Sequence, residues 1–228
     1  GINSNSERAV LIVLDAETGD VIRQIDTGVG SSASPNGLFA PTGAYEADGK
    51  TLKYVFAGDM QGNVWKFDLS DATSTPTLLF TATDADGNAQ PITSKLAIAT
   101  HPLTRKRWVF FGTGRYLTAS DAEATSVAVQ SMYGVIDESE TVERDELTQR
   151  NFSVTSDTVS GFPVRAFEAK SALPADSKGW YINLPESGER IVQDAQVASG
   201  FLVTASMVPT GSACDADGTG YINALNAF

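Results

Sequence analysis

Two loops carry carboxylate pairs that could coordinate a divalent cation. Asp84 and Asp86 lie in the string Asp-Ala-Asp-Gly-Asn, and Asp215 and Asp217 lie in Asp-Ala-Asp-Gly. Calcium takes about six to eight oxygen ligands, several from carboxylates, and neither loop offers a distal glutamate to complete such a set. We therefore expect two ordinary Asp-Gly turns that are only weak candidates for a metal site.

The basic residues are few and could contact an acidic partner. Arg105, Lys106 and Arg107 form the one basic cluster in a chain of formal net charge −12. We expect a solvated hairpin turn there, with docking to an acidic patch on a partner protein as the alternative. Arg115 could reach across a groove to a carboxylate with its planar guanidinium. An ion pair that holds the connection over 117–129 is the favoured alternative, because buried arginines are usually paired.

His101 and Cys214 are the single histidine and the single cysteine. Catalysis by His101 would require an oriented carboxylate and a nucleophile, which no pattern supplies, so we expect a role in a turn. Cys214 stands beside Asp215, where a thiolate is disfavoured, so nucleophilic catalysis is not expected there. The role of Cys214 stays open, because one cysteine cannot form an internal disulfide and does not indicate a redox compartment.

β-strands must position these side chains, and the clearest strands lie in residues 54–69. Tyr54-Val55-Phe56 and Val64-Trp65 consist of β-branched or aromatic residues, and residues 58–63 between them are rich in Gly, Asp and Asn. This pattern predicts a hairpin. A lone hairpin is marginally stable in water, so it must be one module of a larger sheet assembly.

Short apolar strands that end in Asp or Asn recur along the chain. Their ends fall at Asp15, Asp68, Asp137 and Asn226, at irregular intervals. The shorter intervals approach the roughly 40 to 50 residues of a four-stranded propeller blade. We predict a single all-β, propeller-like domain over residues 1–228, with about four modules in a partial or open propeller. A β-sandwich is the alternative.

Smaller features of this fold can also be predicted. The small-residue segments 31–35, 93–97 and 194–198 are predicted as inner strands, because small side chains fit the central taper of a propeller. Segment 37–40 is predicted as a short strand and segment 43–53 as a polar loop. Between residues 138 and 160 the composition shifts to Glu, Asp, Thr, Ser and Arg, which indicates a surface insertion with a short helix over 143–150.

The overall composition excludes several classes of partner. A hydrophobic content of 42% over 228 residues is ordinary for a globular protein. No apolar run approaches the roughly 18 residues of a membrane helix, so we expect no membrane insertion. A net charge of −12 argues against nucleic acid and anionic lipid as partners. The N-terminus lacks the basic and apolar regions of a signal peptide, so we interpret the chain as a piece of a longer protein.

Three strings, in matching order, resemble the C-terminal propeller of the PilY1/PilC family of type IV pilus proteins. They are Ala57-Gly58-Asp59 continued by residues 61–69, Phe-Phe-Gly-Thr-Gly-Arg-Tyr-Leu over 110–117, and Gly-Trp-Tyr-Ile-Asn-Leu-Pro-Glu-Ser-Gly-Glu-Arg over 179–190. The string Leu-Asp-Ala-Glu-Thr-Gly over 14–19 also resembles the repeats of quinoprotein dehydrogenase propellers. A dehydrogenase propeller fragment and a scaffold that binds other envelope proteins are therefore the alternatives.

The resemblance implies a secreted protein at the pilus tip or outer membrane surface of a Gram-negative bacterium. It implies a non-catalytic interaction domain that supports pilus extension, twitching motility and adhesion. The implied partners are minor pilins or other pilus proteins, together with a host or abiotic surface. About four modules cannot close the ring that a quinoprotein dehydrogenase needs, so we expect no enzyme.

Some members of this family bind calcium through the pattern Asp-x-Asn-x-Asp-Gly-x-x-Asp, just before the strand that ends in Ala-Gly-Asp. The corresponding segment here is 45–53, in which Glu46 and Asp48 are the remaining acidic residues. Lys50 and Lys53 place two cations where ligands would be needed. We expect this degenerate loop to bind no calcium, and we expect no other cofactor.

Overall fold

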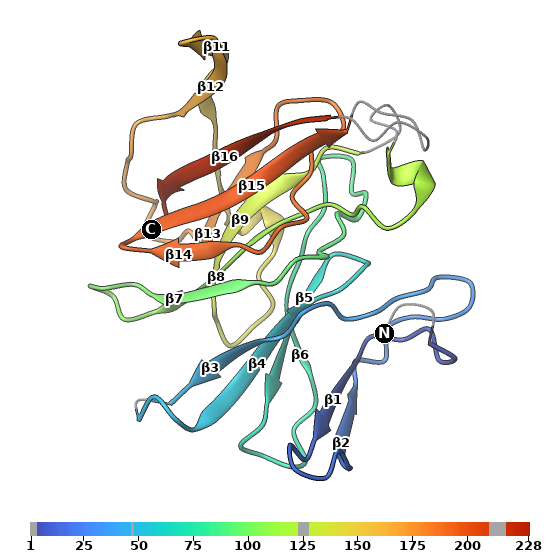
Figure 1. Cartoon of the computed structure of the whole chain (residues 1–228). Helices are drawn as coiled ribbons and strands as arrows, with labels where there is room; N and C mark the ends of the chain where they lie inside the picture. The colour runs from blue at the N-terminus through green and yellow to red at the C-terminus, as the bar shows by residue number, and fades with distance from the viewer. Residues whose placement is uncertain (1–3, 47, 123–127, 210–217) are drawn as a thin grey trace.

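The fold is known from a computed structural model that describes residues 4–46, 48–122, 128–209 and 218–228. These residues form five β-sheets (Figure 1). Two short 3-10 helices interrupt them, η1 at Ala119–Ala122 and η3 at Arg144–Glu146. Within the described ranges, no helix is long and apolar enough to cross a membrane. The prediction of an all-β fold is confirmed.

The predicted hairpin over 54–69 is present. Its strands are β4 at Leu52–Gly58 and β5 at Asn63–Asp68, paired antiparallel. Gly62 lies in the turn with a φ of +85°, which a residue without a Cβ atom adopts at little cost. The hairpin belongs to a four-stranded sheet, which we call the first blade, with β3 at Thr42–Tyr45 and β6 at Thr77–Thr81.

Two further sheets follow the first blade along the chain. The second blade has the strand order β7, β8, β9, β13, β10, with β10 parallel to β13 and the other pairs antiparallel. Its strands are β7 at Ala97–Thr100, β8 at Arg107–Gly112, β9 at Ser131–Ile136, β13 at Gly179–Asn183 and β10 at Thr148–Arg150. The third blade consists of β14 at Gln196–Ala198, β15 at Phe201–Pro209 and β16 at Gly218–Asn226.

The blades are arranged as in a propeller. Their first strands lie side by side, because β7 contacts both β3 and β14. Each sheet then runs outward in chain order, except that β10 lies outside β13 in the second blade. A separate hairpin, β1 at Val10–Leu14 and β2 at Val21–Asp26, packs Leu11 and Ile25 against the outer core of the first blade. In the described part of the chain the sheets do not close a ring, which agrees with the predicted partial propeller.

One contact repeats between successive blades. A Cβ atom on Gly58 would lie 2.2 Å from the Cγ2 atom of Ile92, and a Cβ atom on Gly112 would lie 2.3 Å from the Cγ2 atom of Ile191. Each glycine ends the second strand of a blade, and each isoleucine lies on the segment that enters the next blade. Glycine therefore allows each blade to approach the following one closely at the same place.

The predicted inner strand over 194–198 contains β14, whereas the other two predicted inner strands were placed too early in the chain. Residues 31–34 form a tight turn closed by Ser31 and Ser34, and segment 37–40 makes a single β-bridge at Leu38. The first strands instead begin at Thr42, Ala97 and Gln196. The predicted polar loop over 43–53 therefore contains most of β3. Pairing with the second strand of each blade defines these strands, and their own composition does not reveal that pairing.

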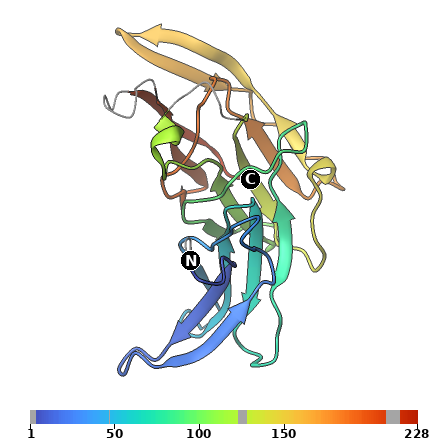
Figure 2. The ribbon, with the colours of Figure 1, turned by 90° about the vertical axis from the view of Figure 1, so that its right-hand side faces the viewer.

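Only part of segment 138–160 is a surface insertion. Val142 and Leu147 are buried in the core, and β10 joins the second blade. The predicted helix over 143–150 is limited to the single turn of η3. From Phe152 onward the chain leaves the blade in the hairpin of β11 at Phe152–Val159 and β12 at Phe162–Phe167, which extends away from the body of the molecule (Figure 2).

Candidate functional site

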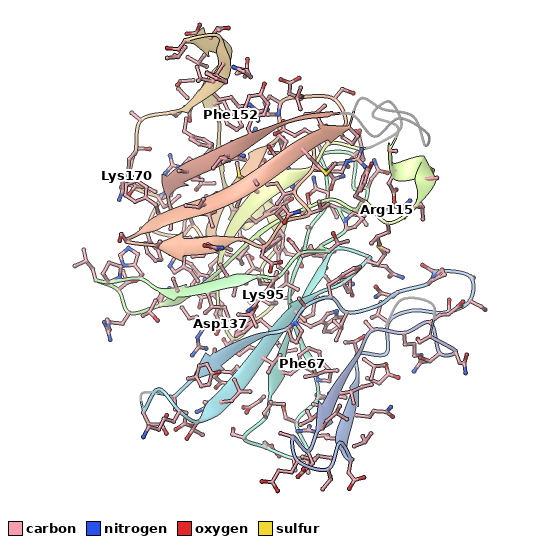
Figure 3. The ribbon with its side chains drawn as sticks, in the orientation of Figure 1. Phe67, Lys95, Arg115, Asp137, Phe152 and Lys170 are labelled. Atoms are coloured by element: carbon pink, nitrogen blue, oxygen red, sulfur yellow. The ribbon has the colours of Figure 1, made fainter. Side chains whose placement is uncertain are left out.

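A pocket of about 470 Å³ lies between the first and second blades. We call it the blade-junction pocket, and its lining residues are Tyr45, Glu46, Lys53, Tyr54, Lys66 and Arg107. The first five come from β3, β4, β5 and the loop between β3 and β4, whereas Arg107 begins β8 of the second blade. Asp137, which follows β9, lies between the two blades at this junction (Figure 3).

Asp137 joins the two blades through ion pairs. Its side chain is only 4% exposed, and its carboxylate accepts hydrogen bonds from Lys66 Nζ at 2.8 and 3.0 Å and from Arg107 Nη1 at 2.8 Å. Lys66 belongs to the first blade and Arg107 to the second. A buried carboxylate is stable only when it is paired in this way, so this arrangement fixes the positions of both cations.

The ring of Tyr54 gathers the positive charges of the pocket. Lys66 Nζ lies 4.5 Å from the ring centroid, the Arg107 guanidinium carbon 5.0 Å and Lys53 Nζ 5.5 Å. The face of an aromatic ring attracts cations through its quadrupole. Tyr54 thus adds cation–π contacts to three cations that Asp137 and Glu46 already pair.

The structure divides the predicted basic cluster. Arg105 adopts a φ of +60° in the β7–β8 turn and is exposed, and Lys106 Nζ pairs with Glu138 Oε1 at 2.9 Å. Arg107 alone reaches the blade-junction pocket. The pocket also contains Glu46 of the predicted degenerate calcium loop, so two candidate segments that are distant in sequence meet there.

The calcium-like loop uses its aspartate internally. Asp48 accepts the hydroxyl of Thr51 at 2.5 Å and the backbone N–H groups of Lys50 and Thr51, each at 2.9 Å. The Thr51 hydroxyl and these N–H groups lower the pKa of Asp48 below its usual value. Lys53 Nζ lies 3.8 Å from Glu46 Oε1. The two acidic residues of the loop therefore already face hydrogen-bond donors and a cation.

The other carboxylate loops were also candidates for a metal. Asp84 accepts the N–H groups of Asp86 and Asn88 and the side-chain amide of Asn88, and the Asp86 side chain is exposed. Asp215, Asp217 and Cys214 lie outside the described residues. In the described ranges, no group of three or more His, Cys, Asp or Glu side chains could hold a metal ion.

Arg115 forms the ion pair that the sequence favoured. Its Nε donates to Asp121 Oδ1 at 2.8 Å. Burial would raise the pKa of Asp121, but hydrogen bonds from Leu117, Thr118 and Arg115 hold it below its usual value. The fully buried Arg190 donates to the backbone carbonyls of Arg115 and Asp121, so the second and third resemblance strings meet in space.

Two further polar residues, Asp59 and His101, form hydrogen bonds within turns. Asp59, in the first resemblance string, is fully buried and accepts side-chain hydrogen bonds from Asn36, Asn63 and Trp65. His101 accepts backbone N–H groups of its own turn at Nδ1. Asp59 therefore builds the β4–β5 turn, and the histidine closes the β7–β8 turn.

Lys66 and Tyr54 were not predicted from the sequence as parts of a site. Lys66 lies in β5 between Trp65 and Phe67, which are both buried. A lysine between two aromatic residues of a predicted strand was the signal in the sequence that could have identified it. A lysine flanked by core residues must have a partner or reach solvent. The partner, Asp137, is 71 residues away in sequence.

The family model, the curated relatives and the solved structure all match PilY1 proteins. The family model described as PilY1 beta-propeller domain matches residues 1–78 and 72–155. Type IV pilus biogenesis factor PilY1 of Pseudomonas aeruginosa strain PAO1 is 28% identical over 263 residues, covering 96% of this chain and 22% of that protein. A PilY1 homolog of Xylella fastidiosa is 34% identical over 235 residues, covering 100% of this chain and 18% of the homolog.

The fold also matches a solved structure. The crystal structure of the Pseudomonas aeruginosa PilY1 C-terminal domain superposes with a TM-score of 0.84 at 24% identity, covering all of this chain and 54% of that one. This likeness concerns the fold. The chain spans about a fifth of the length of the curated relatives that it matches.

Proposed function

The chain belongs to the PilY1 beta-propeller domain family, and from this premise we propose that it is an interaction domain of a type IV pilus biogenesis factor. It works by binding, without catalysing a reaction. Its partners are minor pilins or other pilus proteins, and it acts outside the cell at the pilus tip or outer membrane surface. Through these contacts it favours pilus extension and supports twitching motility and adhesion to a host or abiotic surface.

The proposal rests on the structural role of the polar residues in the three strings that resemble the PilY1/PilC family. Asp59, Arg115 and Arg190 direct their side chains into hydrogen bonds that hold turns and connections. Groups engaged in this way build a rigid platform. Rigid platforms with loops at the ends of their strands are suited to binding partners.

Deleting the segment from the full-length protein tests the proposal. We expect fewer surface pili and reduced twitching while the remaining protein is still exported, and recovery when the wild-type segment is restored. The purified 228-residue chain should also retain at least one minor pilin from the same bacterium in a pulldown. Normal pili and normal twitching after the deletion would contradict the proposal.

An absorption spectrum and a metal assay separate this function from that of a quinoprotein dehydrogenase. We expect the chain purified from its native host to show neither the absorption of a bound quinone nor a stoichiometric metal. A quinone spectrum together with dye reduction in the presence of an alcohol would favour the dehydrogenase.

A further inference from the structure

A separate pocket of about 270 Å³ lies where the connection between β8 and β9 meets the segment that enters the third blade. We call it the arginine pocket, because Arg115 and Arg190 both line it. The Arg115 side chain is 47% exposed and lies near η1 (Figure 3), whereas Arg190 is fully buried. The pocket therefore has one arginine at its rim and one at its floor.

Arg190 is a buried cation that forms no ion pair within the described residues. Its Nε donates to the carbonyl of Gly188 at 3.0 Å, and its Nη1 donates to the carbonyls of Arg115 and Asp121 at 3.1 and 2.7 Å. The neighbouring Glu189 directs its carboxylate to β12 and β15 instead. In the described part of the chain, the buried Nη2 of Arg190 has no hydrogen-bond partner. An anion stabilises a buried guanidinium best, so Nη2 marks the place for an acceptor.

Gln130 offers the opposite kind of group to the same pocket. It is 2% exposed, and its Nε2 donates to the carbonyl of Ala128 at 2.8 Å. Because a carbonyl can only accept, this bond fixes the orientation of the amide and leaves Oε1 as the free atom. Oε1 is buried and has no partner among the described residues. A ligand that satisfies both residues must accept from Arg190 and donate to Gln130.

The charges that line the pocket select the kind of acceptor. The Asp121 carboxylate is already engaged, because it accepts from Arg115 Nε and from the N–H groups of Leu117 and Thr118. The Nη groups of Arg115 have no partner in the described ranges. Two guanidinium groups and one engaged carboxylate leave one positive charge among the described lining residues, which matches a monocarboxylate. A phosphate monoester would bring close to a second negative charge beside Asp121.

The walls and the volume of the pocket limit the size of the ligand. Pockets for drug-sized molecules measure about 300 to 1,000 Å³, and the arginine pocket is slightly smaller. Ala89, Pro91 and Ala128 line it with apolar groups that suit a compact carbon skeleton. The net charge of −12 disfavours a long polyanion. The ligand is therefore a single small acid.

We infer that the arginine pocket binds a small hydroxylated monocarboxylate, such as a uronic acid. The carboxylate accepts from Arg190 Nη2 at the floor and from Arg115 at the rim, and a hydroxyl donates to Gln130 Oε1. The inference goes beyond the proposed function and does not depend on it.

A titration of the 228-residue chain with three ring-shaped probes tests this chemistry. Glucuronate carries a carboxylate and hydroxyls, glucose lacks the carboxylate, and cyclohexanecarboxylate lacks the hydroxyls. The readout is the NMR shift of the Nε–H signals of Arg115 and Arg190 and of the Gln130 amide. We expect saturable shifts with glucuronate, binding about tenfold or more weaker for glucose, and about threefold or more weaker for cyclohexanecarboxylate.

Three variants assign the roles of the side chains. Arg115→Gln should weaken glucuronate binding by about fivefold or more. Arg105→Gln, which changes an exposed arginine outside the pocket, should alter it by less than about twofold. Gln130→Met should remove the preference for glucuronate over cyclohexanecarboxylate, because the acceptor for the hydroxyl is lost. Spectra that are unchanged outside the pocket show that each variant is folded.

Several results would overturn the inference. Glucose or cyclohexanecarboxylate that binds as well as glucuronate would remove the role of the carboxylate or of the hydroxyl. Tighter binding of inorganic phosphate or of an oligogalacturonate would replace the single acid as ligand. Shifts that appear only in Glu123→Gln, a residue outside the described ranges, would assign Arg190 a carboxylate of the chain itself. No saturable shift with any probe would mean that the pocket holds only solvent. The deletion experiment on pili is independent of all these outcomes.

Discussion

Lys66 Nζ lies 2.8 Å from Asp137 Oδ1, so an ion pair joins a central strand of the first blade to the end of β9 in the second. The two residues are 71 positions apart in sequence. The Asp137 carboxylate also accepts a hydrogen bond from Arg107 Nη1, so one buried group sets the positions of two cations. The same contact thus serves both stability and the charge of the blade-junction pocket.

Asp137→Asn should lower the stability of the junction between the first two blades. The variant leaves Lys66 and Arg107 without their counter-charge, and we expect it to lose about 2–3 kcal/mol in the free energy of unfolding, measured by urea denaturation. The exposed Asp176→Asn is the matched control. A variant with wild-type stability would show that the ion pairs do not stabilise the junction.

Gly58→Ala should strain the contact between the first blade and the segment that enters the second. The new methyl group would overlap the side chain of Ile92, and we expect a loss of about 1–3 kcal/mol. In the double variant with Ile92→Ala, the total cost should be less than the sum of the two separate costs, because the second change removes the nearest overlapping atom, Ile92 Cγ2, although the Cβ atom at 2.6 Å remains. Additive costs in thermal unfolding would mean that this overlap is not what destabilises the variant.

Asp59→Ala should disrupt the β4–β5 turn. The side chains of Asn36, Asn63 and Trp65 would lose their shared buried acceptor, and we expect a cost of about 3–5 kcal/mol. Asp86→Ala is the comparison, because Asp86 is exposed and should cost less than about 0.5 kcal/mol. Urea titrations of both variants measure the difference, and similar midpoints would argue against the structural role of Asp59.

The stability of the chain should fall in acid partly through Asp121. Its pKa in the folded state lies below the usual 3.8, so its contribution is present above about pH 4 and is lost as pH falls through the folded-state pKa. Asp121→Asn should therefore lower stability at pH 7 by about 1–3 kcal/mol, with a difference that shrinks as the pH falls toward 3. Unfolding free energies between about pH 3 and 7 test this, and a difference that grows in acid would reverse the assigned sign.

Calcium should have no effect through the loop between β3 and β4. Asp48 is engaged by donors of its own loop, and Lys53 lies near Glu46, so millimolar calcium or a chelator should leave the melting temperature unchanged. Calorimetric titration measures this directly. A micromolar site that disappears in Asp48→Ala would show that the loop rearranges to bind the ion.

The parts of the fold that local pattern encodes were predictable from sequence. The β4–β5 hairpin follows from runs of β-branched and aromatic residues around a Gly-rich turn, and the three strings, in matching order, indicated the family. The first strands of the blades were not predictable to the residue. Thr42–Tyr45 is short and polar in appearance, and it becomes a strand because β4 pairs with it.

The candidate site was predictable only in fragments. Arg107 belonged to the basic cluster, and Lys53 was noted only as an obstacle to calcium. Nothing in the sequence near Lys66 indicates Asp137, because long-range contacts depend on the arrangement of whole blades. Charge at a blade junction is a property of the assembled sheet, which local sequence does not encode.

Strand β8 has a mechanical consequence for the domain. Arg107 at its start faces the blade-junction pocket, and beyond its other end Arg115 holds the connection that contains η1. A force applied between Arg107 and Arg115 would stretch β8 along its length, roughly 20 Å for six residues. The ladder bonds to β7 and β9 run across that direction, so they would have to break together, in shear. Tension applied along β8 therefore meets the geometry in which a sheet resists rupture best.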